Sequence, residues 1–126
     1  MTAKVGNVVI DANDPALLAG FWKQALGYVE EPPEEEGWVF ISDPNDEGPS
    51  LYFQPVPEKK VVKNRLHLDL DSDLSMADEV KQLESLGAKV VVERGHDTWR
   101  WTIMEDPEGN EFCVAEPLVQ LSESLV

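Results

Sequence analysis

Cysteine is almost absent from this chain of 126 residues, in which Cys113 is the only one. A single cysteine excludes an internal disulfide and favours a reducing, cytoplasmic environment. Basic residues are also scarce: 10 Lys and Arg stand against 25 Asp and Glu, for a formal net charge of −15. Because such an acidic surface repels nucleic-acid phosphates and anionic membranes, we expect neither as a partner.

Long hydrophobic runs are missing as well. The most apolar stretch, ALLAGFW, is far too short to span a bilayer. The N-terminal residues contain one lysine but lack the long apolar segment of a secretory signal. The length corresponds to one domain, residues 1–126, that is large enough to bury a core.

The two halves of the chain are alike in sequence. NVVIDANDPALLAGFWKQALG (7–27) matches HLDLDSDLSMADEVKQLESLG (67–87) from end to end. The later parts of each half contain a tryptophan, an Asp-Pro pair and a glycine in the same order, and aligning Gly48 with Gly109 pairs Tyr52 with Cys113. Such repetition indicates two copies of one supersecondary unit.

Each half is predicted to form a strand, a helix and three further strands. Residues 5–11 and 66–71 alternate in polarity with a period of two, as half-buried strands do. Asp14, Pro15 and Gly27 are typical of a helix N-cap, first turn and C-cap. The apolar face of this helix would consist of Leu17, Leu18, Phe21, Trp22, Ala25 and Leu26, and that of the second helix of Met76, Val80, Leu83 and Leu86.

These elements predict an α+β fold of two tandem βαβββ repeats, 5–55 and 65–117, with a linker at 56–64 and a C-terminal tail at 118–126. Each repeat would form a bent mixed sheet with its helix outside and a concave inner face. Two such half-barrel faces, within or between chains, would enclose a cup.

Three segments, LAGFWKQALGY (18–28), NRLHLDLD (64–71) and DPEGNEFCV (106–114), carry a family resemblance. Over residues 5–117 the chain resembles the vicinal oxygen chelate superfamily of glyoxalase I, the bleomycin-resistance proteins and the extradiol dioxygenases. The EFC that follows the last Asp-Pro turn (111–113), together with RLHLDL (65–70), is most similar to the glyoxalase-like subgroup. The resemblance implies a homodimer and four inward-facing metal positions, one on the first and one on the last strand of each repeat.

Strand alternation indicates which side chains face inward. Those facing the helices would be Val8, Ile10, Leu51, Phe53, Leu68, Leu70, Phe112 and Val114. Those facing the cup would be Asn7, Val9, Asp11, Tyr52, Gln54, His67, Asp69, Asp71, Cys113 and Ala115. The four metal positions of the superfamily then fall on Asn7, Tyr52, His67 and Cys113.

That set departs from the histidine, glutamine and glutamate ligands that the resemblance implies. One imidazole, one thiol, an amide and a phenol suit Ni²⁺, Mn²⁺ or Fe²⁺ poorly. Zn²⁺ accepts nitrogen and sulfur donors, and Asp69 could add an oxygen. We predict a degenerate site without a catalytic metal cofactor, in which Cys113 marks a lost ligand.

Three inward residues are candidates for catalysis, each with a plainer alternative. His67 could be a general base, or a histidine hydrogen-bonded to Asp69. Cys113 could be a nucleophile, or an inert buried thiol. Asp69, with Asp11 and Asp71, could serve acid–base chemistry or hold a cationic ligand, or these carboxylates could be neutralised by water, Lys or Arg.

The tryptophans divide between core and cup. Trp22 is expected in the core, whereas Trp38 and Trp101 are repeat partners on central strands, with Trp99 on the face of Trp101. Tryptophans lining a cup would suit a flat or cationic molecule, although plain sheet packing is the alternative.

The function that follows is binding or sequestering of a small aromatic or cationic molecule. The predicted ligand-binding residues are Asn7, Asp11, Trp38, Tyr52, Gln54, His67, Asp69, Asp71, Trp101 and Cys113. The rival is a glyoxalase-type lyase, isomerase or dioxygenase that uses a metal, or acid–base chemistry by His67, Asp69 and Cys113. A purely structural role is disfavoured because polar groups inside a cup are costly without a use.

Overall fold

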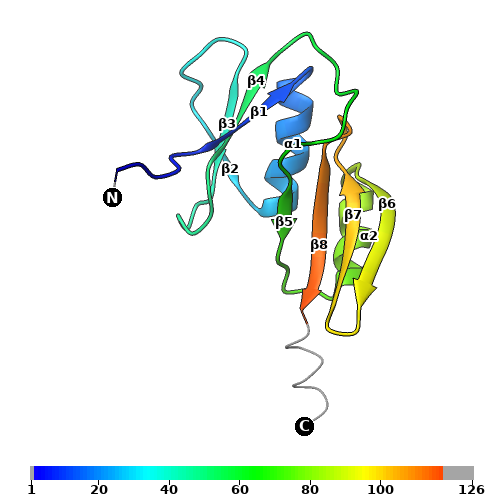
Figure 1. The fold of residues 1–126 in the computed structure, drawn as a ribbon. Coiled ribbons are helices and arrows are strands. Elements are labelled where there is room, and N and C mark those ends of the chain that lie inside the picture. Colours follow the sequence, from blue (N-terminus) through cyan, green and yellow to red (C-terminus); the bar gives the residue numbers. More distant parts are fainter. Residues whose placement is uncertain (1, 118–126) are drawn as a thin grey trace. The chain divides into compact units, whose positions relative to one another are not determined.

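The computed structural model of the protein describes residues 2–117. The chain divides into two compact units, one ending at Lys59 and the other beginning at Lys60, each with one helix and a mixed sheet of four strands (Figure 1). The α+β class and the two βαβββ repeats are therefore confirmed. Residues 56–67, which include the predicted linker, contain neither helix nor strand, and the predicted tail 118–126 lies outside the described residues.

The first unit places its helix against one face of its sheet. Its elements are β1 (Val8–Ala12), α1 (Pro15–Leu26), β2 (Val29–Glu31), β3 (Val39–Ser42) and β4 (Leu51–Pro55). The strand order is β1-β4-β3-β2, in which β1 and β4 run parallel and the other pairs antiparallel. Because α1 contacts β1, β3 and β4, the opposite face of this sheet is turned away from the helix.

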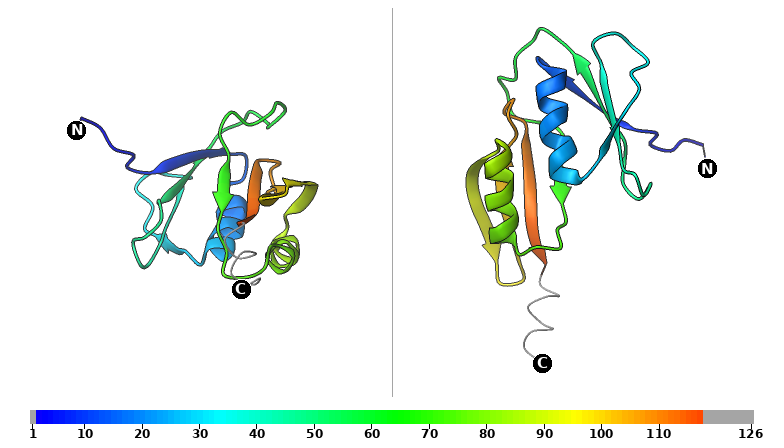
Figure 2. Two further views of the ribbon diagram at one scale, coloured as in Figure 1. Left: turned by 60° about the horizontal axis from the view of Figure 1, so that its bottom comes forward. Right: turned by 180° about the vertical axis from the view of Figure 1, so that it is seen from behind.

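The second unit repeats this topology. Its elements are β5 (Leu68–Leu70), α2 (Met76–Leu86), β6 (Lys89–His96), β7 (Trp99–Glu105) and β8 (Glu111–Pro117). The order is β5-β8-β7-β6, again with the first and last strands parallel. The helix α2 lies along one face of this sheet, as seen from behind in Figure 2.

Helix α1 begins and ends at the residues that the sequence indicates, whereas the N-cap of α2, Ser75, was not predicted. The Asp14 side chain accepts a hydrogen bond from the Leu17 amide at 3.2 Å, Pro15 occupies the first turn, and Gly27 ends α1 in the left-handed conformation with φ 68°. Ser75 caps α2 by accepting from the Asp78 amide at 3.1 Å.

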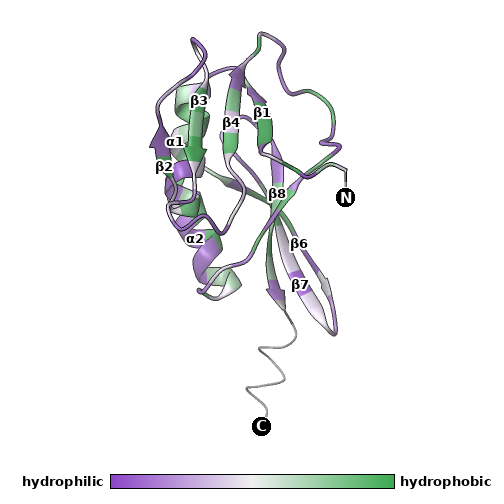
Figure 3. Cartoon of the chain, turned by 90° about the vertical axis from the view of Figure 1, so that its left-hand side faces the viewer, coloured by the Kyte–Doolittle hydropathy of each residue, from purple (hydrophilic) through white to green (hydrophobic). Residues whose placement is uncertain are grey.

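One residue of the predicted apolar face of α1 is not buried. Leu17 is 59% exposed, whereas Leu18, Phe21 and Trp22 are 0%, 4% and 2% exposed. At 100° per residue, Leu17 lies at the edge of the stripe centred between Leu18 and Phe21, so it misses the sheet. The prediction that Trp22 belongs to the core is confirmed. The other core residues of this helix make it the more hydrophobic of the two, as the colours of α1 and α2 in Figure 3 show.

The strands begin and end slightly differently from the sequence prediction. Strand β1 covers 8–12 rather than 5–11, and β5 covers only 68–70, so that Asn7, His67 and Asp71 flank strands instead of lying within them. The alternation holds: Leu51 and Phe53 on β4 are 1% and 0% exposed, while Tyr52 between them is half-buried.

Both Asp-Pro turns are held by hydrogen bonds to the side chain of their aspartate. The Asp43 carboxylate accepts hydrogen bonds from the amides of Asn45, Glu47 and Gly48, which hold its pKa below the usual range. Asp106, which is 4% exposed, accepts in the same way from the amides of Glu108 and Asn110. Each aspartate therefore fixes the turn that leads into the last strand of its unit.

Among residues 2–117, neither helix is long and apolar enough to cross a membrane.

Two glycines of α1 test the capping argument. Gly27→Ala should lower the free energy of unfolding by about 1 kcal/mol, because a side chain is strained at a left-handed position. Gly20→Ala is the matched control, since neither glycine has a neighbour within 4 Å of an added Cβ. Inside the helix the alanine should stabilise by about 1 kcal/mol. Urea denaturation measures both, and a shift of the same sign in the two variants would contradict the assignment.

Candidate functional site

The sheet face turned away from α1 combines aromatic and polar side chains. Register pairs Val9 with Tyr52 and Asp11 with Gln54 across β1 and β4, and Phe40 with Tyr52 across β3 and β4. Directly paired residues share a face, and Leu51 and Phe53 occupy the opposite, buried one. We call this helix-free surface the inner face of the first unit.

Three rings form a cluster on that inner face. The Phe40 and Tyr52 rings lie 4.3 Å apart at 34°, and Trp38, which directly precedes β3, meets Phe40 edge-on at 6.0 Å. Phe40 is 6% exposed, while Trp38 and Tyr52 are half-buried. Phe40 was not predicted as a site residue. Its position two residues after Trp38 could have indicated it, because residues i and i+2 of a strand share a face.

Asn7 and Tyr52 stand at the two positions of the first unit where the resemblance implies metal ligands. Asn7 is exposed ahead of β1, and the Tyr52 ring packs on Phe40. Within residues 2–117, the one group of three or more His, Cys, Asp or Glu side chains placed to hold a metal lies in the second unit.

That group consists of His67, Asp69 and Cys113. Strands β5 and β8 pair Asp69 directly with Cys113, and His67 Nε2 lies 3.1 Å from Asp69 Oδ1. One ligand atom from each residue lies within 4.8 Å of the others. The structure thus brings together the three residues that the sequence offers for catalysis, and His67 makes the contact with Asp69 that was its plainer interpretation.

The thiol of this group is held in its protonated form. Burial raises the pKa of Cys113, and the charge of Asp69 and a hydrogen bond to its carboxylate raise it further. Cys113 is 9% exposed, whereas the side chains of His67 and Asp69 are 52% and 69% exposed. Because only the thiolate is a nucleophile or a metal ligand, this environment makes Cys113 unreactive near neutral pH.

A second carboxylate, missed by sequence analysis, lies on the face of Cys113. Glu111 is two residues earlier on β8, and its Oε1 accepts a hydrogen bond from Lys63 Nζ at 2.6 Å. This bond, with the positive charges of Lys63, Lys60 and His67, lowers the pKa of Glu111. Alternation along β8 was the available signal for Glu111, but no local pattern predicts its cation.

The remaining predicted residues are not members of this group. Asp11 and Asp71 are exposed, and Gln54 is half-buried beside Asp11. Trp101 pairs with Ala115 and Ile103 pairs with Cys113, so Trp101 shares the helix-free face of the second unit, its inner face. His96, which was not predicted, meets the Trp101 ring edge-on at 6.2 Å. That the inner faces of the two units enclose a cup stays a prediction.

The donor set of the second unit fits some metals better than others. One imidazole, one carboxylate and one thiol can serve Zn²⁺, which takes nitrogen, sulfur and oxygen ligands. They do not fit a hard ion such as Mn²⁺, which prefers oxygen ligands and gains little from a thiol. Binding Zn²⁺ would first require deprotonation of Cys113, which its surroundings oppose.

Solved structures share this fold at low sequence identity. A glyoxalase/bleomycin resistance protein/dioxygenase family enzyme from Burkholderia phytofirmans PsJN superposes with TM-score 0.72 at 18% identity, over 90% of this chain and 98% of that one. FosX, a fosfomycin resistance protein from Listeria monocytogenes in complex with Mn(II) and 1S,2S-dihydroxypropylphosphonic acid, gives TM-score 0.72 at 12% identity, over 90% of each chain. The oxidase ChaP-H2 gives TM-score 0.62 at 18% identity, over 91% and 94%.

Two βαβββ units, each closed by parallel pairing of its first and last strands, define a protein of the vicinal oxygen chelate fold. The family profile described as "Glyoxalase-like domain" matches residues 7–115. The chain therefore belongs to the glyoxalase-like domain family, as the resemblance of its sequence motifs implies. Comparison with curated protein sequences gives no significant match.

The reactivity of Cys113 tests the geometry of the group. Since this is the only cysteine, iodoacetamide labelling followed by mass spectrometry reports on it alone. The folded protein should label much more slowly at pH 7.5 than the same protein in urea, and Asp69→Asn should speed labelling by removing a charge that raises the thiol pKa. Asp71→Asn is the charge-matched control, and equal rates for the two variants would contradict the assignment.

Proposed function

We propose that this glyoxalase-like protein binds a small aromatic or cationic molecule on the inner faces of its sheets, with a metal site that has degenerated. The observation that carries the proposal is the ring cluster of Trp38, Phe40 and Tyr52, which occupies the inner face of the first unit where the superfamily has metal ligands.

The aromatic cluster supports binding of a flat molecule. A half-buried tryptophan and tyrosine, packed around a buried phenylalanine, offer a rigid apolar surface at small cost in side-chain entropy. The Asp11 carboxylate is exposed on the same face, next to Gln54. A ring system with a cationic substituent would meet both aromatic and anionic partners there.

Charge supports the cationic alternative in the second unit as well. Asp69 and Asp71 are both exposed near the start of its inner face, and the whole chain carries a formal charge of −15. Such a field attracts cations over a distance of about one Debye length, roughly 10 Å at moderate salt.

The ligand chemistry supports a site without a firmly held metal. Of the four superfamily positions, Asn7 and Tyr52 bring an amide and a phenol, and Cys113 brings a thiol whose pKa is raised. The structure from Burkholderia phytofirmans PsJN is described as a glyoxalase/bleomycin resistance protein/dioxygenase family enzyme, and at 18% identity this likeness supports the fold alone.

The second candidate function is a glyoxalase-type lyase, isomerase or dioxygenase, and one observation favours it. His67, Asp69 and Cys113 lie within 4.8 Å of one another, and the charge of His67 acts on Glu111, so a further carboxylate is near. In such an enzyme His67 would move the proton, with Asp69 orienting its imidazole.

Two wider expectations belong to this proposal. We expect a homodimer, as the superfamily resemblance implies, and a cytoplasmic location, since a single cysteine suits a reducing compartment. Nucleic acid and membranes are not expected as partners of so acidic a chain.

An aromatic cation tests the leading function. 2-Naphthylmethylammonium should bind more tightly than cyclohexylmethylammonium, because only the first can stack on aromatic side chains. Asp71→Asn should weaken its binding about threefold, as expected for an exposed charge, and added salt should weaken it further. Asp46→Asn removes an equal charge from a loop of the first unit and should leave affinity unchanged. Equal affinity of the two cations would count against the proposal.

Metal retention separates the two candidate functions. After incubation with Zn²⁺, Ni²⁺, Mn²⁺ or Fe²⁺ and desalting, elemental mass spectrometry should find much less than one metal per chain, since the thiol in the cluster of His67, Asp69 and Cys113 has a raised pKa. A stoichiometric metal that is retained by the parent protein and lost in His67→Ala would refute the degenerate site and favour the enzyme.

A further inference from the structure

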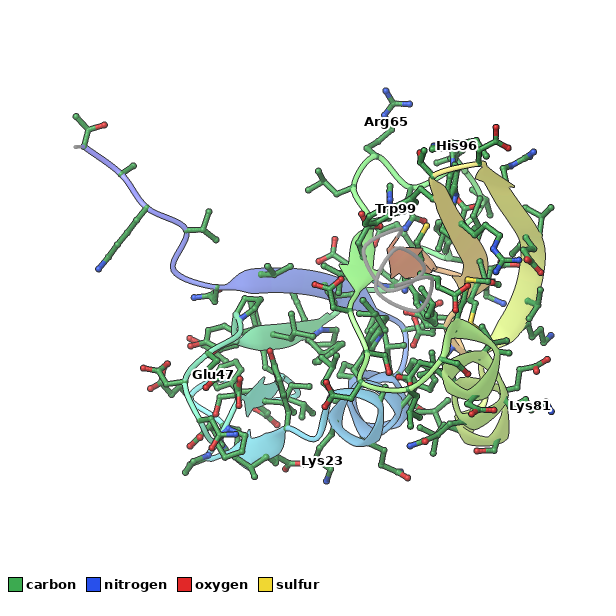
Figure 4. All side chains as sticks on the ribbon, turned by 90° about the horizontal axis from the view of Figure 1, so that it is seen from below. Lys23, Glu47, Arg65, Lys81, His96 and Trp99 are labelled. Atoms are coloured by element: carbon green, nitrogen blue, oxygen red, sulfur yellow. The ribbon has the colours of Figure 1, made fainter. Side chains whose placement is uncertain are left out.

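The hairpin between β6 and β7 contains a cluster of which the proposed function uses only Trp101. Its residues Arg94 to Trp101 include two of the three arginines of the chain and one of its two histidines, together with two tryptophans. Figure 4 labels His96 and Trp99, which lie at the end of β6 and the start of β7. Because arginine and histidine side chains are concentrated here in an otherwise acidic chain, this hairpin favours an anionic ligand and not a cationic one.

Register places four of these side chains on one face. Arg94 is paired with Trp101 and His96 with Trp99, and directly paired residues of antiparallel strands point to the same side. Trp101 is also paired with Ala115, which shares the face of Cys113. The four side chains therefore stand in two adjacent rows on the inner face of the second unit.

The other arginine of the hairpin belongs to the opposite face. Arg100 is paired with Gly95 and Glu116, and its Nη2 lies 2.9 Å from Glu116 Oε2. Among residues 2–117, by contrast, no carboxylate lies within 4 Å of the guanidinium of Arg94. Arg94 is thus the hairpin cation with its charge open to a ligand.

The imidazole of His96 is oriented as a hydrogen-bond donor. The Thr98 amide donates to His96 Nδ1 at 3.2 Å, and the Thr98 hydroxyl lies 2.8 Å from the same atom. Because Nδ1 accepts, the hydrogen of the neutral ring is on Nε2, which can donate to an anion. The edge-on contact of 6.2 Å with Trp101 holds this ring beside the indole.

The hairpin offers aromatic surface to a ligand. Trp99 is 40% exposed and Trp101 is half-buried, so the surface of both indoles is accessible on the inner face. A depression of about 390 Å³ at the hairpin is lined mainly by residues of the opposite face, Glu93, Gly95 and Arg100, and is not part of this surface. Gly95 is required here, because a Cβ would come within 2.6 Å of Arg100 Cγ and 3.0 Å of the Trp99 carbonyl oxygen.

From this arrangement we infer a second ligand site on the hairpin, specific for a planar aromatic carboxylate. The guanidinium of Arg94 pairs with the carboxylate in a bidentate manner, His96 Nε2–H donates to it, and the ring stacks on Trp99 and Trp101. A single carboxylate suits one arginine and one imidazole N–H donor, whereas a phosphate dianion would meet twice the repulsion from the acidic chain. This site shares Trp101 and the inner face of the second unit with the proposed function, but it does not use Asp69 or Asp71, on which cation binding was argued.

Matched aromatic probes test the site. 2-Naphthoate, its neutral amide 2-naphthamide and 2-naphthylmethylammonium are titrated by calorimetry against the full chain and two variants. Arg94→Gln removes the proposed anchor, and Arg100→Gln removes the same charge from the same hairpin on the opposite face. We expect 2-naphthoate to bind more tightly than 2-naphthamide, and to lose about tenfold in affinity in Arg94→Gln but little in Arg100→Gln. Thermal unfolding of both variants verifies that the hairpin remains folded.

The outcomes separate this inference from the proposed function. Equal loss of 2-naphthoate affinity in both arginine variants would show a general charge effect and overturn the site. Binding of the cation and the amide without the carboxylate would overturn it too, while leaving the proposed function intact. Failure of all three probes would contradict both proposals. Trp99→Leu adds a second readout, since loss of the stacking surface should weaken 2-naphthoate and 2-naphthamide alike.

Discussion

The parallel pairing of the first and last strands within each unit is the constraint on which the rest of the structure depends. Strands β1 and β4, and likewise β5 and β8, are far apart in sequence and are joined through a helix and two further strands. Parallel neighbours require such a crossover, which places the helix on one face and leaves the other for side chains of mixed character. The pairing also brings Asp69 opposite Cys113, and Asp11 opposite Gln54.

The two inner faces have the same backbone plan but different chemistry. In the first unit, the rings of Phe40 and Tyr52 lie 4.3 Å apart. In the second unit the repeat partner of Tyr52 is Cys113, which is paired with Asp69 and whose thiol has a raised pKa. Repetition of a fold therefore preserves positions but not side-chain chemistry, and each face must be interpreted from its own side chains.

Particular residues show how far sequence analysis extends into the site. His67, Asp69 and Cys113 were predicted to share a face because strand alternation has a fixed period, and they lie within 4.8 Å of one another. Glu111 was missed, since its importance comes from Lys63, which is 48 residues away in sequence. Leu17 was placed on the buried stripe but is 59% exposed, because helical periodicity does not show where the sheet ends.

Sequence by itself determined the repeat, the helix caps and the alternation of strand faces. These depend on local rules: Asp14 caps α1 because its side chain reaches a nearby amide, and Gly27 ends this helix because it adopts a positive φ. Only the tertiary structure decided which residues stand side by side across strands. Arg94 is paired with Trp101, and Asp69 with Cys113, by strand registers. Packing and turn geometry set these registers, and no local pattern specifies them. The chemistry of each face depends on those registers.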